Sequence, residues 1–371
     1  MIPCGSISAH LRRHPGKTAG GGLLGRLTFR RPRRTMREGG RLLVFPACTL
    51  ISLIWIAVLS VFWGPQAVAQ GANFPNRAIR IIMPFPPGTA PDVALRMLAA
   101  QLSERWKQPL IVENKPGASS IIGTDTVAKA PADGYTLLAT ITLLAQNHSL
   151  RKDLPYDTFR DLVPITQIQR EQLVLYVRGD SAVRNIAELI SRANAHPGKI
   201  NFATWGAGST AHLILEKFRH DKGVQMTQVP YKGAAEIANA VVSGVVDVGI
   251  GDILSSKPFF DSGQLRPIAV TGPSRAPTLS TVETLAEVGL YGFEQYNWVG
   301  LFAPARTSSA IVRKISDAVN ETASDPAYAK RLTDKMFAIP SFTTPEQFAE
   351  IFAHDTARWA AIIQATGVNV P

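Results

Sequence analysis

The sequence predicts an α/β fold made of two lobes joined by a hinge, with a ligand cleft between the lobes. Short apolar strands alternate with amphipathic helices, which is typical of βαβ units in a mainly parallel sheet. The alternation occurs in two successive sets, and residues 70–371 are enough for two separate cores. In each set, one strand ends in a glycine-rich turn that leads into a helix, and ligands of open α/β sheets bind outside such strand ends.

The first set contains three strands and two helices. In chain order, we expect a strand at 78–83, a helix at 92–107, a strand at 110–112, a helix at 122–129 and a strand at 135–140. Leu95, Leu98 and Leu102 give the first helix an apolar stripe at helical spacing. The Asp133-Gly134 pair marks the turn before the last strand.

The second set begins after Gln172. In chain order, we expect a strand at 173–177, a helix at 186–195, a strand at 200–204, a helix at 211–219, a strand ending at Val229, a helix at 234–243, and strands at 245–250 and 266–271. His196-Pro197-Gly198 ends the first of these helices, and Gly244 follows the last one, where glycine commonly ends a helix.

The C-terminal part is predicted to be helical. Thr344 is a predicted N-cap, with Pro345 at the first helical position and Gln347 at the third, which is a near-complete capping box. Apolar and aromatic residues then recur at helical spacing and are expected to pack in the core. We expect residues 72–172 and 298–371 to form the first domain and residues 173–297 the second, with hinge strands near 172–178 and 264–300.

The net charge of +11 is concentrated at the N-terminus. Residues 1–69 hold ten of the 39 basic residues and a single acid, Glu38, so the rest of the chain is nearly neutral. A nucleic-acid-binding protein needs a basic face on its folded part. We therefore expect no nucleic-acid partner.

Residues 1–69 have the features of a secretory signal peptide. Arg37 and Arg41 lead into a long apolar run at 42–63, and a small-residue cleavage motif ends at Ala69. We expect cleavage after Ala69 and Sec-type export to the periplasm. An uncleaved membrane anchor is the alternative, because about 20 apolar residues can span a bilayer.

Two further features belong to this leader. Met1 and Met36 are both possible starts, since either leaves a basic segment before the apolar run. Both cysteines, Cys4 and Cys48, lie here, so the mature chain is expected to have no disulfide and no cysteine-bound metal.

The two glycine-rich turns are the predicted binding elements. A helix N-terminus offers unpaired backbone N–H groups and a positive dipole end, which together hold an anion. The candidate ligand contacts of the first turn are Phe85, Pro87, Gly88, Thr89 and Asp92. Those of the second turn are Gly206, Gly208, Ser209, Thr210 and His212. Asp92 is alternatively a dipole-complementing residue, and His212 a packed structural one. We expect the two turns to hold a small carboxylate.

Five more candidates lie at other strand ends. Thr140 and Thr142 end a strand of the first lobe, while Lys232, Gly233 and Asp252 follow strands of the second. Lys232 would neutralise a second carboxylate of the ligand, or else is a solvated loop residue. Asp252 would repel an anion, so it fits only a ligand that also carries an amine.

Seven short segments occur in the order seen in one known family. They are PFPPG at 84–88, VENKPGA at 112–118, ADGYTLL at 132–138, LPYD at 154–157, GAGS at 206–209, VPYKG at 229–233 and WVGLFAPA at 298–305. Together they resemble the periplasmic solute-binding proteins of tripartite tricarboxylate transporters, the Bug family. The resemblance covers about residues 74–370.

The resemblance implies a monomeric, two-lobed Venus-flytrap protein of the type II-like periplasmic-binding-protein fold. It also implies capture of a small carboxylate between the lobes and delivery to the membrane permease subunits. Two positions depart from the family pattern: Thr89 replaces a glycine after the first motif, and Ser119 with Ser120 replaces a glycine pair. The identity of the carboxylate therefore does not transfer.

Other function classes find little support. Residues 206–211 read G-x-G-x-x-A, but no acidic residue ends the next strand as a dinucleotide site requires. A hydrolase using Ser209 and His212 is a remote alternative, because the G-x-S-x-G elbow and a third triad member are missing. We expect no catalysis, no cofactor and no metal. A periplasmic carboxylate sensor that docks on a receptor kinase is the other open alternative.

Overall fold

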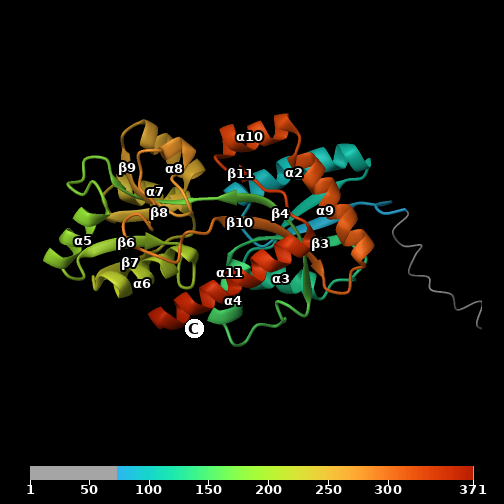
Figure 1. The fold of residues 1–371 in the computed structure, drawn as a ribbon, viewed down its shortest axis with the longest axis horizontal. Coiled ribbons are helices and arrows are strands. Elements are labelled where there is room, and N and C mark those ends of the chain that lie inside the picture. Colours follow the sequence, from blue (N-terminus) through green and yellow to red (C-terminus); the bar gives the residue numbers. More distant parts are fainter. Residues whose placement is uncertain (1–72, 371) are drawn as a thin grey trace, which may run out of the picture. The chain divides into compact units, whose positions relative to one another are not determined.

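The computed structural model describes residues 73–370, which lie within one compact unit, Pro65–Pro371. The predicted signal peptide and its cleavage position lie outside the described residues. The described chain forms two β-sheets with helices packed on them (Figure 1). The predicted α/β class with two lobes is confirmed.

The first sheet has the strand order β11-β4-β10-β3-β1-β2. Its strands are β1 (Ile79–Met83), β2 (Leu110–Asn114), β3 (Thr136–Ile141), β4 (Leu162–Glu171), β10 (Asn297–Pro304) and β11 (Ile339–Pro340). β1 is parallel to β2 and β3, as the βαβ pattern predicts, but β10 is antiparallel to β3 and β4. The sheet is therefore mixed. Its antiparallel strands β4 and β10 are those that carry the chain to and from the second sheet.

Helices cover both faces of the first sheet. They are α2 (Ala90–Trp106), α9 (Ser309–Ala323) and α10 (Pro326–Met336) on one face, and α3 (Ile121–Ala128), α4 (Leu143–Leu150) and α11 (Pro345–Thr366) on the other. Ile81 packs with Leu95 on the first face, while its neighbour Ile82 packs in the opposite core with Phe348. Successive side chains of a strand point to opposite faces, so a strand covered on both sides is apolar throughout.

The second sheet has the strand order β7-β6-β8-β5-β9. Its strands are β5 (Leu173–Arg178), β6 (Ile200–Thr204), β7 (Met226–Pro230), β8 (Val248–Asp252) and β9 (Leu265–Val270). Its helices are α5 (Ile186–Ala195), α6 (Thr210–Lys222), α7 (Ala234–Val242) and α8 (Ile253–Asp261). β6 is parallel to β7 and β8, whereas β5 is antiparallel to β8 and β9.

The chain crosses between the two sheets at two neighbouring places. β4 and β5 are separated only by Gln172, and the return runs from β9 to β10. The Gln172 side-chain amide donates to the carbonyls of Thr271, at 2.6 Å, and Ser274, at 2.7 Å. The two crossings are therefore tied together at the point where the sequence predicts a hinge. The predicted domain boundaries remain predictions.

One predicted strand is displaced. The strand expected at 245–250 is β8, which begins only at Val248 and extends to Asp252. Val245 is 65% exposed, and its N–H and that of Val246 donate to the Ala240 carbonyl at the end of α7. These two valines belong to the helix-ending turn after Gly244 and not to the sheet.

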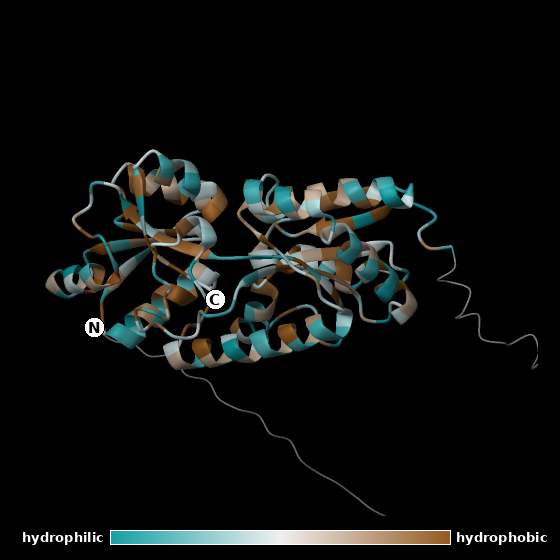
Figure 2. Cartoon of the chain, turned by 45° about the horizontal axis from the view of Figure 1, so that its top comes forward, coloured by the Kyte–Doolittle hydropathy of each residue, from teal (hydrophilic) through white to brown (hydrophobic). Residues whose placement is uncertain are grey.

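The C-terminal helix α11 follows the sequence prediction closely. Thr344 and Gln347 form a complete capping box, Pro345 is in the first turn, and Gly367 ends the helix at φ 67°. Phe348, Phe352 and Trp359 are all buried, which confirms them as core residues. Figure 2 shows teal and brown turns alternating along the helices, as expected of helices with one buried face.

Candidate functional site

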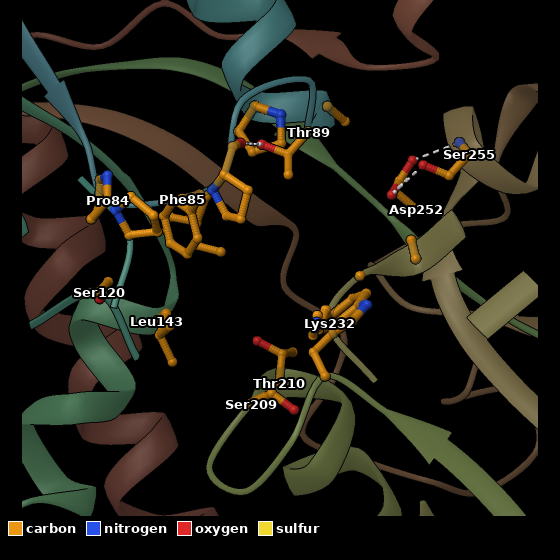
Figure 3. Close-up of a pocket in the computed structure, with 18 of the residues that line it drawn as sticks. Pro84, Phe85, Thr89, Ser120, Leu143, Ser209, Thr210, Lys232, Asp252 and Ser255 are labelled. Atoms are coloured by element: carbon orange, nitrogen blue, oxygen red, sulfur yellow. Dashed lines mark hydrogen bonds between the residues drawn. The ribbon is translucent and has the colours of Figure 1, made fainter. Parts of the chain in front are cut away.

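A cavity of about 630 Å³ is lined by residues of both sheets. Three segments that follow strands supply most of its wall: 84–91 after β1, 205–210 after β6, and 231–235 after β7. In Figure 3, Phe85, Ser120 and Leu143 face Ser209, Thr210 and Lys232 across an open space. The predicted position of the site, at strand ends of both sheets, agrees with this cavity.

The first glycine-rich turn is closed by the residue four positions after its glycine. Gly88 has φ +81°, and its N–H donates to Oδ2 of Asp92 at 2.9 Å. Thr89 is the N-cap of α2 in extended backbone geometry, and its hydroxyl donates to the Pro86 carbonyl at 3.1 Å. Within residues 73–370, no hydrogen bond occupies the N–H of Thr89 or Ala90, so these N–H groups remain for a ligand.

The second turn is built in the same way. Gly208 has φ +77°, and its N–H donates to Nδ1 of His212 at 3.0 Å. Ser209 is the N-cap of α6, and its hydroxyl is bonded to the Gly206 carbonyl at 2.8 Å. In the described chain, the N–H groups of Thr210 and Ala211 carry no hydrogen bond.

Asp92 and His212 are therefore the residues that close the two turns. Asp92 is 1% exposed and also bonds Arg96, at 3.0 Å, and Asn114, at 2.8 Å. Burial raises the pKa of Asp92, but the bonds from Arg96, Gly88 and Asn114 outweigh it and lower the pKa overall. His212 accepts the Gly208 N–H on Nδ1, so that nitrogen carries no proton here. Neither residue lines the cavity, and each positions a glycine instead.

Most of the other candidates lie on the cavity wall. The predicted residues that line it are Phe85, Pro87, Gly88, Thr89, Thr142, Ser209, Thr210, Lys232, Gly233 and Asp252. Thr140, Gly206 and Gly208 are not among the lining residues. Thr140 is fully buried in β3, and a Cβ at Gly208 would lie 3.1 Å from Val370 and thus point toward the end of the chain. The structure therefore brings ten of the fifteen candidates to the cavity.

The two departures from the family pattern have distinct consequences. Thr89 has φ −69°, so the positive φ of the first turn falls on Gly88 and the threonine is accommodated without strain. Ser119 and Ser120, by contrast, have φ values of 52° and 74°, and Ala118 before them has 45°. Three successive non-glycine residues thus adopt left-handed geometry, and both serines line the cavity.

Several lining residues were not among the predicted ligand contacts. They include Glu171, Trp205, Tyr231, Ser255 and Asn297. Glu171 is half-buried: part of its surface is exposed in the cavity, and protein atoms surround the rest of its side chain. Burial, together with the nearby charge of Asp252, raises the pKa of Glu171 to about 8.

Asp252 is the N-cap of α8. Its carboxylate accepts the Ser255 N–H at 2.7 Å and the Ser255 hydroxyl at 3.0 Å (Figure 3). Burial raises the pKa of Asp252 despite these bonds.

Across 73–370, no group of three or more His, Cys, Asp or Glu residues is arranged to hold a metal ion. In that range, none of the helices combines the length and apolar character needed to cross a bilayer.

Several known proteins are similar to this chain in sequence. A family model described as "Tripartite tricarboxylate transporter family receptor" matches residues 94–368. Protein BugT of Bordetella pertussis is 33% identical over 320 residues, which cover 85% of this chain and 98% of BugT. A UPF0065 protein from the tcbD-tcbE intergenic region of a Pseudomonas species is 35% identical over 298 residues, covering 80% of this chain and 88% of that protein.

Solved structures share the fold. An R. palustris protein solved with adipate is 32% identical, with a TM-score of 0.74, and covers 80% of this chain and 99% of its own. The periplasmic binding protein BugD is 29% identical, with a TM-score of 0.71, covering 80% and 99%. MatC from Rhodopseudomonas palustris, with bound malate, is 27% identical, with a TM-score of 0.71, covering 78% and 100%. The two-lobed periplasmic-binding-protein fold predicted from the sequence is thus confirmed, and the chain belongs to the tripartite tricarboxylate transporter family of receptors, which are periplasmic solute-binding proteins.

Proposed function

We propose that this protein captures a small carboxylate in the 630 Å³ cavity and delivers it to the membrane permease subunits of a tripartite transporter. The observation that carries the proposal is the pair of matched turns at the starts of α2 and α6. In each turn the glycine N–H is hydrogen-bonded to a side chain of the same turn, whereas the next N–H groups at the helix start have no partner in the described chain and can bond a ligand. Two positive dipole ends, one from each sheet, form a site for a carboxylate without an arginine.

The similar proteins support the chemistry. The R. palustris structure contains adipate, and MatC contains malate, so both relatives hold a small carboxylate. Each charge-assisted hydrogen bond to a carboxylate contributes roughly 1.5–3 kcal/mol, so a few bonds support a micromolar dissociation constant, about −8 kcal/mol. No catalytic step is needed for this role. We further propose that the protein acts as a monomer in the periplasm after removal of residues 1–69.

Closure of the two lobes would couple binding to delivery. The predicted domains, 72–172 with 298–371 and 173–297, would move about the crossings tied by Gln172. A carboxylate that contacts both turns binds the closed form better than the open form and so shifts the population toward it. The permease would then recognise the closed form.

A pair of substitutions at Ser209 tests the binding site. Asp and Asn are both good N-caps, so Ser209→Asp and Ser209→Asn each preserve the start of α6. A negative charge about 6 Å from a bound carboxylate costs about 2–3 kcal/mol at an effective dielectric constant near 20. We expect Ser209→Asp to weaken carboxylate binding roughly 100-fold, and Ser209→Asn to change it little.

The measurement is calorimetric titration of the purified chain from residue 70 onward with succinate, adipate, malate and benzoate, after a thermal-shift screen. If the two Ser209 variants bind the same acid with equal affinity, the turn at the start of α6 does not contact the ligand. Delivery is tested separately, by uptake of the bound acid into cells with and without the permease genes.

A further inference from the structure

One end of the cavity is acidic, which is unexpected for a site that holds an anion. Glu171 ends β4 and Asp252 ends β8, and both line the cavity. Sheet pairing brings them together: Asp252 is opposite Leu173 in the β5–β8 ladder, and Glu171 lies two residues before Leu173 along the crossing strand. The negative charge of Asp252 acts directly on the Glu171 carboxyl group.

The cavity wall carries more acidic than basic side chains. Its charged residues in the described chain are Glu171, Asp252 and Lys232, which is two acids against one base. Lys232 is exposed and forms no ion pair with a described residue, so it does not neutralise either acid. A second carboxylate of the ligand would be repelled by Asp252, whereas an ammonium group would be attracted to Asp252 and would favour the ionised form of Glu171.

The two acids also differ in how well their oxygens are satisfied. Asp252 receives two hydrogen bonds from Ser255. Glu171 has no hydrogen-bond partner among residues 73–370, although protein atoms surround its carboxyl group. The Glu171 carboxyl group is half-buried, so water solvates it only in part, and its open side faces the ligand cavity.

We propose that Glu171 and Asp252 form a subsite for the ammonium group of the ligand, whose carboxylate lies at the helix starts of α2 and α6. This inference rests on the proposed carboxylate-binding function and specifies its ligand class as an aminocarboxylate. An ammonium group offers three donors, which can bond the unpaired Glu171 oxygens and a remaining lone pair of Asp252. Phe85, Leu143 and Trp205 also line the cavity and offer apolar surface for a carbon chain or ring of the ligand.

The test compares aminocarboxylates with diacids of similar length: in two pairs an ammonium group replaces a carboxylate, and in the third it is added to a diacid. The probes are 4-aminobutanoate against succinate, 6-aminohexanoate against adipate, and L-glutamate against glutarate, each titrated calorimetrically at pH 7.5. We expect the tightest aminocarboxylate to bind at least tenfold more tightly than its matched diacid.

Variants then locate the subsite. Glu171→Gln and Asp252→Asn keep the side-chain shape, and Asn still caps α8. Each should weaken binding of the preferred aminocarboxylate at least tenfold and narrow its advantage over the matched diacid. Lys232→Met is the control, because the preference for an amine should survive loss of this lysine, the one basic residue that residues 73–370 place on the wall. Thermal melts establish that each variant is folded.

The outcomes separate the two proposals. Tighter binding of the diacids, or an amine preference unaffected by both acid variants, overturns the ammonium subsite while the carboxylate function stands. Failure of every carboxylate probe to bind overturns the proposed function and the subsite with it.

Discussion

At the scale of single residues, backbone strain and an unpaired carboxyl group occur together at the cavity. Ala118, Ser119 and Ser120 adopt positive φ in succession, and Glu171 has a carboxyl group without a hydrogen-bond partner in the described chain. Such features cost stability and persist when the surrounding structure determines them. Ser119, Ser120 and Glu171 line the same cavity, which is consistent with residues that serve ligand binding and not the stability of the fold.

Relief of the strain should stabilise the protein. Ser119 has φ 52°, which glycine adopts without penalty, so we expect Ser119→Gly to raise the free energy of unfolding by about 0.5–1 kcal/mol. Ser119→Ala is the matched control, because it removes the hydroxyl but keeps the Cβ that makes the conformation unfavourable. Urea melts measure both; an equal gain for the alanine variant would contradict the strain argument.

The Glu171 carboxyl group should give the stability a characteristic pH dependence. Its pKa is raised from an ordinary value of 4.5 to about 8, so the folded state binds more protons than the unfolded state between these values. The associated stability is complete below about pH 4.5 and is lost as the pH rises through 8. In the ligand-free protein, we therefore expect the unfolding free energy to fall between pH 5 and 8.5 more steeply in the wild type than in Glu171→Gln. Parallel slopes in denaturant melts would show that Glu171 ionises normally.

The sequence revealed the local half of the site and missed the long-range half. Gly88, Ser209 and Thr210 belong to turns whose residues are adjacent in sequence, so strand, glycine and N-cap signals were enough to find them. Asp92 and His212 were predicted as candidate contacts, but a bond back to the glycine four residues earlier turns each away from the cavity. Glu171 and Asn297 are partners in the β4–β10 ladder. Because they are far apart in the sequence, no local sequence pattern predicts that they lie together.

At the scale of elements, α11 connects the two halves of the described chain. Its Asp355 is 3% exposed and accepts the Trp298 indole N–H of β10 at 2.9 Å. Asp355 also holds Arg358, which donates to the Gly292 carbonyl in the segment that returns from the second sheet. The Trp359 ring contacts Phe293 of the same segment. The capping signals of this helix were plain in the sequence, but its role as a bridge depends on these distant partners.

Removal of the Asp355 carboxylate should be costly. Asp355→Ala leaves a buried indole N–H without its acceptor and a largely buried arginine without its ion-pair partner, so we expect a loss of about 3 kcal/mol in unfolding free energy. Glu346→Ala on the same helix breaks an exposed pair with Arg313 and should leave the midpoint almost unchanged. Chemical denaturation measures both, and similar small effects would show that the bridge contributes little.

At the scale of the whole described chain, two sheets joined by two neighbouring crossings place one cavity between their strand ends. The fold class was predictable because strand and helix periodicities are local. The mixed direction of the first sheet was not, since it depends on β4 and β10 pairing across more than a hundred residues.

Ligand binding should stabilise the chain as a unit. A ligand at 100 times its dissociation constant adds about 2.7 kcal/mol to the unfolding free energy if it binds only the folded state. Because the cavity wall comes from both sheets, we expect one transition that moves upward as a whole in scanning calorimetry. A transition that splits, with only one part shifted by the acid, would show that a single lobe binds the ligand.

Trp205 gives the cavity a built-in optical reporter. Of the four tryptophans in residues 73–370, it alone lines the cavity, while Trp298 and Trp359 are buried in the core. Occupancy and closure should thus change the emission of one indole against a constant background from the others. The same range contains no cysteine, so a thiol introduced at the rim would accept a dye at that position alone. The chain is therefore suited to conversion into a fluorescent sensor for its own ligand.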